Sequence, residues 1–166
     1  MARLTVGKGL QLTIQSYKNL SGKLSGIIKR SVYPVAGDLA GKITKELKNL
    51  PVVDGKDGLP PYAPKGYKLN SISSVQRKDL LNGFGISRFK NENGFINVKM
   101  GFDGYGSYKT KKHPRGIPNA LLIRSLCKGT DFLKRNDFIS RTFRANEKGL
   151  EKDLESNFND LIRREL

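Results

Sequence analysis

Apolar residues recur at helical spacing over the first third of the chain. Between positions 14 and 50 they are separated mostly by steps of four, in the series Leu20, Leu24, Ile28, Val32, Val35, Leu39, Ile43 and Leu47. A stripe of this kind predicts one long amphipathic helix over residues 14–50. Pro34 lies inside the stripe, and an interior proline removes a backbone hydrogen bond, so we expect either a kink or two helices in series. Pro51 follows as a stop signal.

The next segment is rich in proline, and a hairpin follows it. Residues 51–78 contain a run of prolines and predict a long irregular connector. Residues 83–92 and 95–102 then flank Asn93-Gly94, a dipeptide that tolerates the positive φ angles of a type I′ hairpin turn. The second strand alternates apolar and other residues through Ile96, Val98, Met100 and Phe102. The first strand changes parity, which leaves its register and any bulge open.

The last third of the chain predicts a loop and two helices. Residues 103–116 are glycine-rich, basic and partly aromatic, so we expect a second long connector that is mobile in isolation. Pro118 can open a short helix that ends at Gly129. A final helix should begin near Asn136 or Asp137. We therefore expect an α+β fold and a single domain over residues 1–166, with a long N-terminal helix, a small antiparallel sheet around a central hairpin, a short helix and a C-terminal helix.

The chain is strongly basic, and its charge is unevenly distributed. Lys and Arg number 31 against 15 Asp and Glu, for a net charge of +16 over 166 residues. Residues 1–116 hold 21 basic and 7 acidic side chains, whereas residues 117–166 hold 10 and 8. A field of this strength attracts polyanions and acidic protein surfaces alike. The excess charge lies on the first helix, the hairpin and the loops.

Residues that carry catalysis are scarce. His113 is the only histidine and Cys127 the only cysteine, and carboxylates and histidines do not cluster as metal ligands do. We interpret His113 as a solvated loop residue and Cys127 as a small apolar filler. Residues 1–14 lack the continuous apolar run of a signal peptide, and no stretch approaches the roughly 20 apolar residues of a membrane span. We expect no enzymatic activity, cofactor, metal or membrane contact, and synthesis in the cytoplasm.

The basic loop is the best candidate for a contact surface. Its cations could contact phosphates while its tyrosines stack on bases. The candidate contact residues are Tyr105, Tyr108, Lys109, Lys111, Lys112 and Arg115. Many surface loops that order only against a protein partner, or not at all, have the same composition. We give that interpretation precedence over nucleic-acid binding.

Several short motifs occur in an order that resembles a known family. Leu50-Pro51 stands at the predicted end of the first helix, and Asp-Leu-Leu-Asn-Gly at 79–83 leads into the hairpin. Asn119-Ala120, then Lys128-Gly129-Thr130, then Asp-Phe-Ile-Ser-Arg-Thr at 137–142 follow. In this arrangement the chain resembles the neck or tail-completion proteins of tailed bacteriophages, minor tail components that join the head connector to the tail.

The resemblance implies a structural role in the virion. Members of that family assemble into a closed homo-oligomeric ring, with six subunits expected, on the axis between head connector or adaptor proteins and the tail terminator or tail tube. Genomic DNA passes through the lumen, and the motif residues turn and pack the chain rather than catalyse. The Pro-rich segment and the basic loop are the contacts we expect there. The alternative is a basic nucleic-acid-binding protein that uses residues 108–115 and the lysine-rich face of the first helix.

Overall fold

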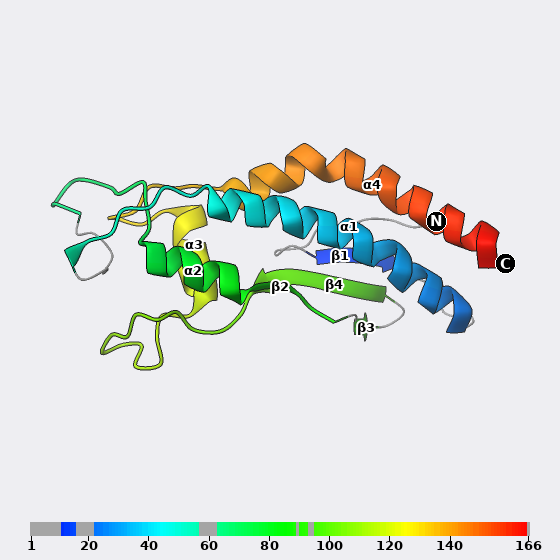
Figure 1. Ribbon diagram of the computed structural model, residues 1–166, viewed down its shortest axis with the longest axis horizontal. Coiled ribbons are helices and arrows are strands. Elements are labelled where there is room, and N and C mark those ends of the chain that lie inside the picture. Colours follow the sequence, from blue (N-terminus) through cyan, green and yellow to red (C-terminus); the bar gives the residue numbers. More distant parts are fainter. Residues whose placement is uncertain (1–10, 16–21, 57–62, 89, 93–94, 166) are drawn as a thin grey trace. The chain divides into compact units, whose positions relative to one another are not determined.

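The computed structural model describes residues 11–15, 22–56, 63–88, 90–92 and 95–165 (Figure 1). Its elements, in chain order, are β1 (Gln11–Gln15), α1 (Gly22–Lys48), α2 (Ser74–Gly83), β2 (Phe84–Ile86), β3 (Lys90–Glu92), β4 (Phe95–Phe102), α3 (Asn119–Lys128) and α4 (Phe138–Glu165). The α+β prediction is confirmed, including the long first helix and the C-terminal helix. Across the described ranges, no helix is both long enough and apolar enough to pass through a bilayer.

Contacts within the chain define two compact units, and each is assembled from segments far apart in the sequence. One contains residues 1–41, 86–101 and 143–166, and the other contains residues 42–85 and 102–142. Both α1 and α4 contribute residues to the two units. The expectation of a single domain over residues 1–166 therefore stays a prediction.

The predicted apolar stripe forms the buried face of α1. From the second turn onward its members are at most 2% exposed, namely Ile28, Val32, Val35, Leu39, Ile43 and Leu47. The helix continues through Pro34 without a break, so a division into two helices is wrong. Its predicted start is also wrong, because Ile14 lies in β1. The local sequence Gln-Leu-Thr-Ile-Gln alternates with a period of two, which is the pattern of a strand.

The sheet is antiparallel around β4. Its order is β1-β4-β2, and β3 also pairs with β4. The β3–β4 pairing places Glu92 opposite Phe95, which confirms the predicted hairpin, whose turn at residues 93–94 lies outside the described residues. Between β2 and β3, Ser87 donates its backbone N–H to the carbonyl of Lys99 at 2.7 Å and accepts the N–H of Lys99 on its hydroxyl at 2.9 Å. This side-chain bond lies directly after the last residue of β2.

The unit formed by residues 42–85 and 102–142 contains a helix that the sequence analysis missed. Residues 74–78, predicted as connector, begin α2. Ser73 caps this helix: its hydroxyl accepts the N–H of Gln76 at 3.1 Å, and its own N–H donates to the Gln76 side-chain oxygen at 3.0 Å. Such a capping box satisfies backbone donors that would otherwise lack partners at a helix start.

Short backbone contacts organise the connectors of the same unit. Leu69 donates its N–H to the carbonyl of Phe132 at 2.8 Å and accepts the N–H of Lys134 at 2.8 Å. The guanidinium of Arg77 donates to the carbonyls of Lys48 and Leu50 at 3.1 and 3.4 Å. A cation at this position satisfies carbonyls at the C-terminus of α1 and complements the helix dipole.

Both predicted C-terminal helices are confirmed. Pro118 precedes α3, and Gly129, with a φ of 77°, follows its last residue. Asp137 immediately precedes α4, and its carbonyl accepts the N–H of Arg141 at 3.1 Å. Phe138, the first residue of α4, is 1% exposed.

Candidate functional site

The predicted basic loop forms a short hairpin that backbone hydrogen bonds hold together. We call residues 104–118 the basic hairpin. Gly106 donates its N–H to the carbonyl of Ile117 at 2.8 Å, and Ile117 donates to the carbonyl of Tyr108 at 3.0 Å. At the far end, Thr110 and His113 exchange N–H···O bonds of 3.1 and 3.0 Å, which leaves Lys111 and Lys112 as a two-residue tip. The segment is therefore organised by hydrogen bonds of its own backbone.

Side chains of α2 anchor this hairpin at its base. The carboxylate of Asp79 accepts the backbone N–H of Ser107 at 2.6 Å and its hydroxyl at 2.8 Å. Farther along the hairpin, the hydroxyls of Tyr108 and Ser73 lie 3.0 Å apart, within hydrogen-bond distance. Asn119, which is 3% exposed, donates its amide to the carbonyl of Asp103 at 2.8 Å. These bonds hold the first strand of the hairpin to α2 and its N-cap, and the residue before the hairpin to the start of α3.

Two glycines allow the hairpin strands to approach each other closely. Gly116 has a φ of 109°, a conformation that residues with a Cβ rarely adopt. A Cβ added there would collide with the carbonyl oxygen of Gly106. At Gly106, an added Cβ would lie 3.0 Å from the Asp79 carboxylate. The glycine-rich composition thus permits a compact hairpin.

The six candidate contact residues divide into two groups. The four cations are all exposed along the outer part of the hairpin, and they are Lys109, Lys111, Lys112 and Arg115. Tyr105 is 57% exposed. Tyr108 is half-buried, and its hydroxyl is engaged with Ser73. Of the two tyrosines proposed for stacking, Tyr105 presents the exposed ring and Tyr108 acts as an anchor.

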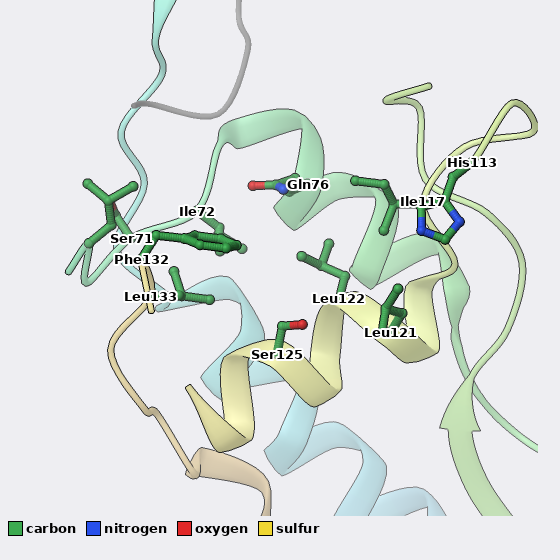
Figure 2. A pocket seen from close by; sticks show the side chains of 11 residues that line it. Ser71, Ile72, Gln76, His113, Ile117, Leu121, Leu122, Ser125, Phe132 and Leu133 are labelled. Carbon is green, nitrogen blue, oxygen red and sulfur yellow. The ribbon is translucent and has the colours of Figure 1, made fainter. Parts of the chain in front are cut away.

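An apolar pocket lies beside the hairpin, between α2 and α3 (Figure 2). It measures about 260 Å³. Its apolar lining consists of Leu69, Ile72, Ile117, Leu121, Leu122, Phe132 and Leu133, and its polar lining of Ser71, Gln76, His113 and Ser125. In Figure 2, His113, Ile117 and Leu121 lie at one end of the pocket and Phe132 at the other. All of these residues belong to the unit formed by residues 42–85 and 102–142.

His113 differs from its expected environment. We expected a solvated loop residue, but its side chain is half-buried and lines the pocket. The reason is the tight turn between Thr110 and His113, which returns the chain toward the helices.

Cys127 has little nucleophilic character in this fold. Burial, with a further contribution from the negative charge of Asp137, raises the pKa of its thiol to about 11. Because the thiolate is the reactive form, the neutral thiol that dominates near neutral pH is a weak nucleophile. Among the residues that the structure describes, no group of three or more His, Cys, Asp or Glu side chains could hold a metal ion.

Sequence reasoning located the cations of the basic hairpin. It missed α2, which anchors the hairpin, and the pocket that lies beside the hairpin. The capping box formed by Ser73 and Gln76 is a local signal that could have revealed α2. No local signal marks the Asp79–Ser107 bonds or the pocket, because their residues are far apart in the sequence.

Comparison of the chain with protein-family models, with curated proteins and with solved structures found no match.

Proposed function

We propose that this protein is a non-catalytic structural component of the neck of a tailed bacteriophage. In this role it joins the head connector to the tail as a subunit of a closed ring around the DNA channel. The observation that carries the proposal is where the motif residues of the resemblance lie. Asn119 begins α3 and ties it to the chain before the hairpin, while Gly129 ends α3. Phe138, buried, begins α4. Residues that turn and pack the chain are expected at the starts and ends of helices, and these three residues lie there.

The charge of the protein supports acidic proteins as its neighbours. A ring requires interfaces in which one surface of a subunit meets a different surface of the next. The basic hairpin offers four exposed cations on a backbone that is already ordered, so little conformational entropy is lost when a partner binds. Head connector or adaptor proteins and the tail terminator or tail tube are the neighbours we propose for the ring, with genomic DNA passing through its lumen.

Deletion of the gene from its phage genome tests this proposal. A neck component is needed only to join finished parts, so lysates should contain DNA-filled heads and complete tails that are separate. Electron microscopy distinguishes these from joined particles, and supplying the gene from a plasmid should restore joining. Intact virions from the deletion strain would refute the proposal.

A second candidate function is nucleic-acid binding. It is favoured by the exposed ring of Tyr105 on the same hairpin as the four cations. The test is binding to duplex DNA at increasing salt concentration. Nucleic-acid binding predicts tight binding at physiological salt, with a steep loss of affinity as salt rises, and loss of binding when all four cations are replaced by Ala. Weak binding that the replacement does not change would exclude this function.

A further inference from the structure

The apolar pocket has the size of a side-chain site. At about 260 Å³ it lies below the roughly 300–1,000 Å³ of pockets that hold drug-sized ligands. Two of its lining residues, Leu121 and Phe132, are 41% and 60% exposed. Large apolar side chains that remain exposed around a concave apolar surface are typical of protein contact sites. A pocket of this kind suits one large apolar side chain of a partner.

Exposed cations are sequence neighbours of residues that line both ends of this pocket. Lys112 directly precedes His113 at the hairpin end, while Lys68 precedes Leu69 and Lys134 follows Leu133 at the other. The whole unit that contains the pocket, residues 42–85 and 102–142, holds 17 basic and 7 acidic side chains. A field of this sign favours a negatively charged occupant. It disfavours a second copy of this chain, which carries the same net charge of +16.

We propose that the pocket and the hairpin tip together bind an acidic segment of a partner protein. One large apolar side chain of that segment enters the pocket, and neighbouring carboxylates pair with Lys111 and Lys112. A polypeptide fits better than a nucleic acid, because the lining is mainly aliphatic and concave, whereas single-stranded nucleic acids bind on flat aromatic platforms. That the partner is a protein rests on the proposed function. That its segment carries a large apolar side chain is inferred from the pocket.

Short designed peptides test this docking site directly. The probe contains Asp, Glu, Ser and Gly around one central Phe, and matched controls replace the Phe by Ala or the acids by Asn and Gln. Binding is followed by NMR on the isotope-labelled full chain. The Phe peptide should shift the amide signals of Leu69, Leu122 and Leu133 in a saturable way, and the Ala peptide should bind about tenfold more weakly. Equal binding of the Phe and Ala peptides, or shifts confined to other residues, would overturn the proposal.

Filling the pocket provides a second test. Ser125 on α3 lines the pocket and is half-buried, so Ser125→Leu places extra apolar volume inside it. The matched control is Ser156→Leu at an exposed position of α4. The first substitution should weaken the Phe peptide about tenfold, and the second should leave its affinity unchanged. Unchanged affinity in a folded Ser125→Leu protein would contradict the proposal.

Charge reversal at the hairpin tip covers the case in which Ser125→Leu fails to fold. Lys111→Glu with Lys112→Glu changes only exposed side chains, and Lys148→Glu with Lys152→Glu makes the same charge change on α4. The tip variant should bind the Phe peptide several-fold more weakly than the control variant. Equal affinities of the two variants would overturn the proposed role of the tip.

Other occupants of the pocket would give distinct results. Self-association of the wild type that Ser125→Leu abolishes would assign the pocket to a second copy. Larger shifts of the pocket signals with duplex DNA than with the Phe peptide would assign it to nucleic acid. Either result overturns the docking proposal. If the gene deletion yields unjoined heads and tails but the Phe peptide does not bind, the docking proposal falls and the neck function stands.

Discussion

The carboxylate of Asp79 on α2 holds Ser107 of the basic hairpin by two hydrogen bonds. One comes from the backbone N–H at 2.6 Å and the other from the hydroxyl at 2.8 Å. A charged acceptor makes stronger hydrogen bonds than a neutral one. The four exposed cations of the hairpin are thereby carried on a segment that is fixed to a helix.

Removing this anchor should loosen the hairpin. We expect Asp79→Ala to lower the free energy of unfolding by about 1–2 kcal/mol and to speed amide exchange at Gly106, Ser107 and Ile117. Ser107→Ala is the matched control, because it keeps the backbone bond and should cost less. Hydrogen exchange measured by NMR reports both effects. Unchanged protection of the three amides in Asp79→Ala would show that the anchor is dispensable.

A methyl group at Gly116 should be poorly tolerated. Its φ of 109° and the nearby carbonyl oxygen of Gly106 leave no room for a Cβ, so Gly116→Ala should cost at least about 2 kcal/mol of stability. Gly37→Ala on α1 serves as the control, because an added Cβ there has no atom within 4 Å. The control should gain about 0.5–1 kcal/mol, since alanine favours a helix over glycine. Similar urea-unfolding midpoints for the two variants would contradict this account of the hairpin.

Asp137 should make stability depend on pH in the acidic range. Hydrogen bonding from Ser140 is the main cause that lowers the pKa of this carboxyl, and Arg135 lowers it further, with an ion pair of 3.1 Å. Because the pKa is depressed in the folded state, this stabilisation is present above the ordinary Asp value of about 4 and is lost as pH falls through the folded value. Asp137→Ala should therefore lower the melting temperature most near neutral pH. A melting-temperature difference that stays constant down to about pH 3 would refute the assignment.

Cys127 should react slowly with thiol reagents in the native protein. With the pKa of its thiol raised to about 11, the thiolate fraction near pH 8 is about a hundredfold below that of an ordinary cysteine. The native chain should be alkylated correspondingly slowly, and the urea-unfolded chain at the normal rate. Asp137→Ala should speed the native reaction, because the Asp137 charge raises the Cys127 pKa. Mass spectrometry of the labelled chain provides the rates, and equal native and unfolded rates would contradict the prediction.

Local periodicity accounts for what the sequence could predict. The buried face of α1 from Ile28 to Leu47 follows the 3.6-residue pattern, because residues on one side of a helix recur every three or four positions. Pairing of Glu92 with Phe95 follows from the local hairpin pattern. By contrast, only Gln76 and Leu80 of α2 are buried, so an apolar stripe was absent and the capping box was its main signal.

The candidate site depends on contacts that local patterns do not encode. Asp79 and Ser107 lie 28 residues apart, and the pocket gathers lining residues from Leu69 to Leu133. Cations could be located because charge is a property of each residue. Their attachment to α2, the anchoring role of Tyr108 and the half-buried position of His113 follow only from the tertiary fold.

In vitro joining tests the proposed neck function most directly. Purified protein is added to a lysate of the gene-deleted phage that contains separate heads and tails, and joined particles are counted by electron microscopy and by infectivity. The account predicts that the wild-type protein restores joined, infectious particles. Heads and tails that stay separate after addition of the folded protein, in a lysate that wild-type phage extract can complete, would contradict it.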